Sequence, residues 1–191
     1  MTHESFCYQF RKHLKEVPKI ALLGIRGYSS TDYPNNITSL YDDAIVRYMN
    51  GEIKIFEASV DPGAYYVNNP INALGCARLK TGLWYYQYGE HLHNHPCLTQ
   101  AEEVTVDRLD RHGKKLCEDT GHFGVNIHSG GPEYLIGRYS AGCQIIKTGE
   151  AWKDKWQDFF LPLFAAMGIY DQKKIPYLLV DRLEPISLPE L

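Results

Sequence analysis

The chain has 191 residues, of which 44% are hydrophobic and 23% charged, and its formal net charge is −3. This length and composition are typical of one globular domain with a sizeable core, so we treat residues 1–191 as a single domain. A net negative charge gives no electrostatic support for a nucleic-acid partner, and no apolar run of about 18 residues is present to span a membrane.

The cysteines indicate the compartment of synthesis. There are five, an odd number, and they are scattered without a C-x-x-C pair. This pattern disfavours a disulfide framework or a zinc ribbon and is typical of a reducing compartment. The N-terminal segment lacks the apolar stretch of a secretion signal. We therefore expect synthesis in the cytoplasm without a signal peptide.

Two segments predict helices. Residues 4–17 place apolar side chains on one stripe and end at Pro18, which stops a helix. Residues 152–167 place aromatic side chains on one side, and Pro162 is expected to kink this second helix. We divide the chain into an N-terminal helix (1–18), a core (20–160) and a C-terminal extension (161–191).

Short strands separated by turns make up most of the remaining pattern. Asn50-Gly51 lies between two apolar runs and is the strongest signal for a hairpin. The last strand contains Pro176, so we place it at a sheet edge. The pattern predicts a β-rich α+β fold, a curved sheet or sandwich with flanking helices. The predicted strands are residues 19–25, 43–48, 53–59, 82–89, 103–109, 123–128, 140–147 and 176–180.

Two of these strands carry the residues of thiol chemistry. One strand ends at His128, and Ser129 and two glycines follow it. The other strand begins with the sequence Ser140-Ala-Gly142-Cys143. Covalent catalysis by cysteine needs a thiolate, a base and donors for a developing oxyanion. Cys143 is the candidate nucleophile and His128 the candidate base. The backbone N–H groups of Gly142 and Cys143 are the candidate oxyanion donors, because a glycine lets a carbonyl approach the backbone closely.

This arrangement resembles the active-site signature of the L,D-transpeptidase (YkuD-type) family, in which a His is followed, after a variable loop, by Ser-His-Gly-Cys and an Arg two positions on. His128, Ser140, Gly142 and Cys143 match that signature. More closely, the whole pattern resembles phage and prophage proteins related to this fold. That similarity spans roughly residues 20–160, through the segments 24–28, 41–45, 123–128 and 140–144.

Two positions depart from the family pattern. Ala141 stands where the family has the histidine between Ser and Gly, and Ile145 stands where it has the arginine. Since that arginine lies close to the catalytic centre in the family, another arginine would have to replace it. Arg138, Arg26 and Arg78 are the candidates, and the sequence alone does not choose among them.

The resemblance implies a fold of the L,D-transpeptidase type and a cysteine-dependent peptidoglycan stem-peptide hydrolase or transpeptidase that works through a thioester at Cys143. It implies no cofactor and no metal, and it implies that the backbone carbonyl of Ser129 orients His128. The cell wall lies outside the cytoplasm and no signal peptide is visible. We therefore expect phage-type or secretion-system delivery to the periplasm or cell wall.

The geometry expected of this site is specific. A ring nitrogen of His128 should lie roughly 3–5 Å from Cys143 Sγ, because consecutive strands usually neighbour each other. Asn126, on the same strand face as His128, either fixes that ring or pairs across the sheet. The substrate-binding residues expected around the pair are Ser140, Arg138, Tyr139, Trp84 and Tyr86, and the Ser140 hydroxyl is equally consistent with capping the turn of its own loop.

Two alternatives remain open. His91, His93 and His95 alternate on one strand face and could ligate zinc, as in a zinc-dependent cell-wall peptidase. Further ligands could come from Asp119, His122 and His128. Asn94 and Pro96 would instead make this segment a polar loop. The other alternative is a non-catalytic binding or virion protein that keeps the fold.

Overall fold

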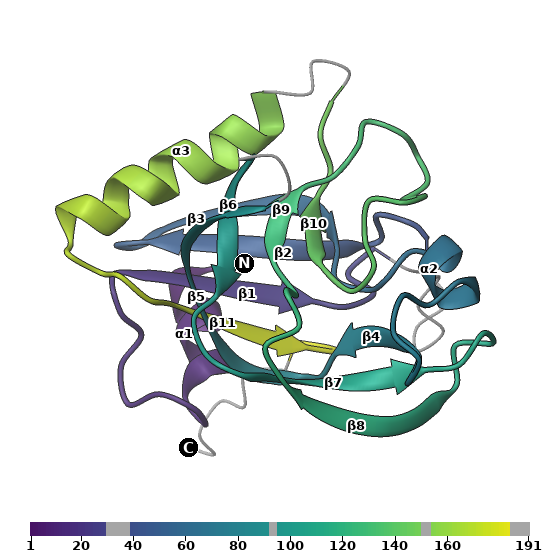
Figure 1. Cartoon of the computed structure of the whole chain (residues 1–191). Coiled ribbons are helices and arrows are strands. Elements are labelled where there is room, and N and C mark those ends of the chain that lie inside the picture. Colours follow the sequence, from purple (N-terminus) through teal and green to yellow (C-terminus); the bar gives the residue numbers. More distant parts are fainter. Residues whose placement is uncertain (30–38, 92–94, 150–153, 184–191) are drawn as a thin grey trace.

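A computed structural model of the chain describes residues 1–29, 39–91, 95–149 and 154–183, and eight of its strands close into a barrel (Figure 1). Around the barrel the order is β1-β11-β5-β6-β9-β10-β3-β2, with β2 returning to β1. The barrel strands are β1 (Ile20–Ile25), β2 (Asp43–Met49), β3 (Glu52–Ser59), β5 (Gly82–His91), β6 (His95–Gln100), β9 (Ile127–Ser129), β10 (Gln144–Ile146) and β11 (Ile175–Val180).

A second, antiparallel sheet of three strands has the order β4-β7-β8. Its strands are β4 (Cys76–Leu79), β7 (Val104–Leu109) and β8 (Lys115–Gly121), and the helices are α1 (His3–Phe10), α2 (Ala64–Asn68) and α3 (Asp154–Ile169). Figure 1 shows α3 and the three-stranded sheet on opposite sides of the barrel. The expected β-rich α+β class is confirmed, but the main sheet is a closed barrel and not a sandwich.

Burial on both faces explains the continuous apolar run of β1. Ile20 and Leu22 belong to the main core, which the barrel strands share with α3. Ala21, Leu23 and Ile25 point the other way and pack with Phe6 and Phe10 of α1. The helix therefore covers the outer face of this strand, so both sets of side chains are removed from water.

Helix α1 is shorter than predicted. The carbonyl of Phe10 accepts hydrogen bonds from the N–H groups of both His13 and Leu14, so the helix ends in a turn. Leu14 and Val17 still pack against the α1 cluster although they lie outside the helix. The apolar stripe was thus a correct sign of burial but not of helix length.

The hairpin of β2 and β3 is confirmed. Asp43 to Met49 pair with Ala58 to Glu52 in antiparallel register. Asn50 and Gly51 both have positive φ, 47° and 98°, as the tight hairpin turn requires.

The C-terminal part of the chain completes the barrel. The expected boundary between residues 160 and 161 falls inside α3, where Phe159, Phe160 and Leu163 all belong to the main core. Trp152, which was predicted to belong to this helix, lies outside the described residues. The placement of the last strand at a sheet edge was wrong, because β11 lies between β1 and β5. Pro176 precedes Tyr177, the first β11 residue whose partner in β1 is Leu22, so the proline lies before this parallel pairing begins.

No helix within the described ranges combines the length and the apolar character needed to cross a bilayer.

Candidate active site

The parallel pairing of β9 with β10 positions the predicted dyad. Ile127 is paired with Gln144, and both side chains face the barrel interior, where the Tyr177 hydroxyl donates to Gln144 Oε1 at 3.0 Å. Successive side chains of a strand alternate between faces. His128 and Cys143 therefore project from the outer surface of the barrel.

Three side chains converge there. The ligating atoms of His91, His128 and Cys143 all lie within 4.8 Å of one another. The expected closeness of Cys143 to His128 is therefore found. His91, at the end of β5, joins them, and its ring stacks on that of His128 with centroids 4.7 Å apart. The sequence analysis placed His91 with His93 and His95, and with His128 only as a possible further zinc ligand. It did not place His91 beside Cys143, because the sequence does not show that the end of β5 reaches β9.

The state of the His128 ring is set by its neighbours. Its Nδ1 lies 2.8 Å from the backbone oxygen of Ser129, so Nδ1 carries the proton and Nε2 the lone pair. Nε2 is buried and has no hydrogen-bond partner among the described residues. Burial lowers the pKa of His128 to about 4, against a smaller opposing effect of the Ser129 carbonyl. The ring is therefore neutral at pH 7, as a general base must be.

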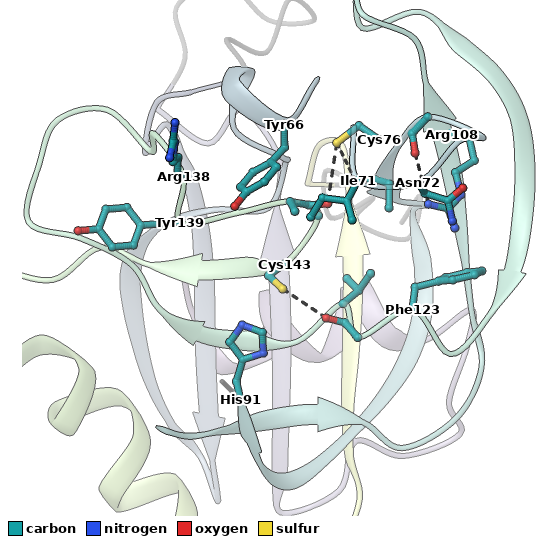
Figure 2. A pocket seen from close by; sticks show the side chains of 16 residues that line it. Tyr66, Ile71, Asn72, Cys76, His91, Arg108, Phe123, Arg138, Tyr139 and Cys143 are labelled. Carbon is teal, nitrogen blue, oxygen red and sulfur yellow. Dashed lines mark hydrogen bonds between the residues drawn. The ribbon is translucent and has the colours of Figure 1, made fainter. Parts of the chain in front are cut away.

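The thiol of Cys143 is protonated in the resting structure. Its Sγ donates to the backbone oxygen of Gly124 at 3.3 Å, as Figure 2 shows. Burial raises the pKa of Cys143 to about 11, although the backbone N–H of Asn126 acts in the opposite direction. The expectation of a lowered thiol pKa is not met, because desolvation of a thiolate outweighs one backbone donor. The thiol is therefore neutral at pH 7.

Ser140 holds the turn that carries the cysteine. Its hydroxyl is fully buried, donates to the backbone oxygen of Cys143 at 2.7 Å and accepts from the N–H of Gly142 at 3.2 Å. Of the two roles considered for Ser140, its hydroxyl thus takes the one within its own turn, and Ser140 is not among the residues that line the cavity. The Gly142 N–H is also occupied, so only the Cys143 N–H remains of the two oxyanion donors that we expected.

Gly142 is required by two features of this turn. Its φ of +135° is one that other residues rarely adopt. A Cβ at this position would also lie 2.8 Å from the backbone oxygen of Ala77 in β4. The glycine of the motif thus lets the turn lie directly against the three-stranded sheet.

A cavity of about 440 Å³ opens beside Cys143. In Figure 2, Arg138, Tyr139 and Tyr66 lie on one side of it and Phe123 and Arg108 on the other, and His91 points toward the cysteine. Arg138 and Tyr139 therefore line the cavity as expected. The aromatic residues beside them are Tyr66 and Phe123, which the sequence analysis did not single out.

Trp84 and Tyr86 do not line this cavity, which corrects their expected role. Tyr86 is fully buried in the barrel and packs edge-on against Tyr177. Trp84 packs against the same core, and its Nε1 donates to the backbone oxygen of Lys80 at 2.8 Å. Both side chains of β5 pack in or against the main core and are not among the residues that line the cavity.

The structure distinguishes the three candidate arginines. Arg26 is buried and pairs with Asp61 at 2.8 Å, and Arg78 pairs with the same carboxylate at 3.0 Å. Arg138 is exposed, and its guanidinium lies over the ring of Tyr65, 4.1 Å from the centroid. Arg138 is therefore the one of the three that offers a charge to the cavity.

The predicted zinc cluster is found only in part. His93 lies outside the described residues. His91 and His95 are partners across the pairing of β5 with β6, and His95 is exposed. Asn126, which we expected to fix His128 or to pair across the strand, instead places its Nδ2 3.1 Å from His91 Nδ1.

Comparisons with protein-family models, curated proteins and solved structures find no match for this chain. Its function must therefore be argued from the geometry of this site together with the sequence motif.

Proposed function

We propose that this chain is a cysteine-dependent acyl-transfer enzyme that acts on peptidoglycan stem peptides. The observation that carries the proposal is the position of Cys143 and His128, with ligating atoms within 4.8 Å of each other next to a cavity. The substrate class comes from the resemblance of the sequence motif to the L,D-transpeptidases.

The proposed reaction begins with attack by Cys143 Sγ on a peptide carbonyl carbon while Nε2 of His128 takes the thiol proton. The tetrahedral intermediate then collapses, the C–N bond breaks, and His128 returns the proton to the leaving amine. A thioester remains on Cys143. Water as the acceptor completes a hydrolysis, and an amine of another stem peptide completes a transpeptidation.

Two features of the resting site bear on this step. The thiol donates to Gly124, so it must turn toward His128 before its proton can be transferred. The neutral thiol transfers its proton to the neutral imidazole only as the C–S bond forms. The pair therefore works as a thiol activated by a neighbouring base, and not as a thiolate–imidazolium pair formed before the substrate binds. We assign the oxyanion to the Cys143 N–H, since the Gly142 N–H is bonded to Ser140.

Arg138 is the proposed contact for a substrate carboxylate. Its guanidinium is positioned by the ring of Tyr65 and lies at the cavity that contains Cys143. A planar guanidinium binds a carboxylate through two parallel hydrogen bonds. Stem peptides carry free carboxylates, so this charge fits the proposed substrate. The arginine missing at Ile145 leads us to favour hydrolysis, and the enzyme would reach the cell wall by phage-type or secretion-system delivery.

The test is incubation of the purified protein with isolated sacculi, followed by mass spectrometry of the released muropeptides and of the intact protein. The expected results are shortened or cross-linked stem peptides and a protein adduct whose mass equals the acyl donor without its leaving amine. The adduct should map to Cys143. Unchanged muropeptides and no adduct would favour the non-catalytic alternative.

A further inference from the structure

The three converging side chains of the site are of the types that bind zinc. Zinc holds a thiolate at about 2.3 Å and imidazole nitrogens at about 2.0–2.1 Å in tetrahedral geometry. Those bond lengths separate the ligand atoms by about 3.3–3.6 Å. The atoms of His91, His128 and Cys143 already lie within 4.8 Å of one another, so a movement of about 1 Å brings them to that spacing.

His128 is prepared as a ligand. Its Nδ1 lies 2.8 Å from the carbonyl of Ser129, and this contact leaves the lone pair on Nε2, which is buried without a partner among the described residues. Metal-binding histidines are commonly oriented in this way, with the second ring nitrogen donating to a carbonyl or a carboxylate.

His91 has a comparable partner. Its Nδ1 lies 3.1 Å from the side-chain amide of Asn126. If the amide turns over, Asn126 Oδ1 accepts from Nδ1–H, and Nε2 of His91 is left to bind. The ring must also tilt out of its stack on His128, where the planes now meet at 18°. His91 lies at the end of β5 and lines the cavity, so the tilt is toward open space.

We propose that His91, His128 and Cys143 together bind one Zn²⁺ ion whose fourth coordination position faces the cavity. Binding forms one Zn–S and two Zn–N bonds and releases the thiol proton to solvent, with no change in oxidation state. A thiolate and two imidazoles favour zinc over magnesium or calcium, which prefer oxygen ligands.

The consequence for activity rests on the proposed function. A bound ion would occupy both the nucleophile and the lone pair of the base, so zinc would inhibit acyl transfer reversibly. The site would then be a regulatory one, and the metal-free protein would be the active form.

The test measures zinc binding directly by equilibrium dialysis of the purified protein against zinc chloride, with metal analysis of the retentate. We expect one zinc per chain. Cobalt in place of zinc should give a thiolate-to-cobalt charge-transfer band, which histidine or carboxylate ligands alone do not produce. Zinc should also protect Cys143 from alkylation, and this measurement requires no variant.

Variants assign the ligands. Cys143→Ala and His91→Gln should each weaken zinc binding by at least ~100-fold. His95→Gln and Cys76→Ser are the matched controls, because His95 faces His91 across the strand pair and Cys76 is a second buried thiol at the same cavity. Both controls should bind zinc as the wild type does.

The outcomes separate the two proposals. Wild-type protein that binds less than one zinc per chain after dialysis against zinc chloride would overturn the zinc site, whether or not a thioester forms. Cys143→Ala protein that binds zinc as tightly as the wild type would overturn it as well. Stoichiometric zinc with the cobalt thiolate band would establish the site even if sacculi are never cleaved.

Discussion

The imidazole of His91 lies flat against that of His128, with ring centroids 4.7 Å apart and planes 18° from parallel. His91 lines the cavity, whereas Nε2 of His128 is buried. The proposed base is thus covered by a second histidine that a substrate would meet first. Two charged rings in this stack would repel each other. Burial is the largest cause of the lowered pKa of His128, and the charges of His91 and His95 lower this pKa further.

The free energy of unfolding should fall at acidic pH because His128 is buried. Burial lowers the pKa of His128 from 6.5 to about 4. Between these two pH values the His128 side chain is protonated in the unfolded chain but neutral in the folded chain. Stability is therefore complete above pH 6.5 and falls as the pH drops toward 4, by up to about 3 kcal/mol. Urea unfolding across this range should show the loss, and His128→Gln should reduce the slope. A His128 ring that titrates near pH 6.5 by NMR would contradict this prediction.

Replacement of the proposed nucleophile should abolish turnover without unfolding the chain. Cys143→Ala should reduce activity on sacculi by several orders of magnitude, because nucleophile and base act as a unit. Cys97→Ala is the matched control, since Cys97 is also a buried free thiol of the barrel but does not line the cavity. Circular dichroism should show both variants folded. Turnover retained by folded Cys143→Ala would end the covalent mechanism.

Chelation should leave the enzyme active. If Cys143 is the nucleophile, EDTA should not lower the rate on sacculi, and the protein as purified should contain less than one zinc per chain. The measurement is a rate with and without EDTA, after metal analysis. Activity that EDTA removes and zinc restores would instead assign the chemistry to a metal held by His91 and its neighbours.

Gly142→Ala should destabilise the fold. The φ of +135° strains an alanine, and the new Cβ would lie 2.8 Å from the Ala77 oxygen, so we expect a loss of about 2 kcal/mol or more. Gly137→Ala is the milder comparison, since its φ of 55° lies in the left-handed region that alanine can adopt and a Cβ there meets no atom within 4 Å. Thermal unfolding should give a lower melting temperature for Gly142→Ala than for Gly137→Ala. Equal melting temperatures would show that the close contact with β4 does not destabilise the variant.

Arg138 should affect substrate binding more than chemistry. Arg138→Gln should raise KM severalfold with a smaller change in kcat, because it removes a charge that binds ground state and transition state alike. Arg138→Lys should recover part of the effect, since it restores the charge but not the planar contact with Tyr65. Steady-state kinetics on a soluble stem peptide decides this, and an unchanged KM in both variants would exclude Arg138 from recognition.

Local signals predicted the parts of the fold that depend on neighbouring residues. Asn50-Gly51 predicted its hairpin because two positive φ angles are needed there. The closeness of Cys143 to His128 followed from the pairing of two consecutive strands. The sequence did not show which face of β5 points inward, because aromatic residues occupy both faces. Trp84 and Tyr86 were therefore misplaced.

Long-range pairing accounts for most of what was missed. β11 closes the barrel against β1, and His91 reaches the site only because β5 and β6 carry it to β9. β8 was not predicted because its side chains are mostly exposed and polar, so it has no apolar alternation to detect.

The place of β11 also has a consequence for how the chain is made. β1 is synthesised long before β11, because Ile25 of β1 pairs with Val180 of β11. Until then β1 and β5 each present an unpaired edge, which is a site for aggregation. Pairing over so great a sequence separation also slows folding. We therefore expect barrel closure to follow synthesis, so that a chain truncated before Ile175 would accumulate as insoluble protein.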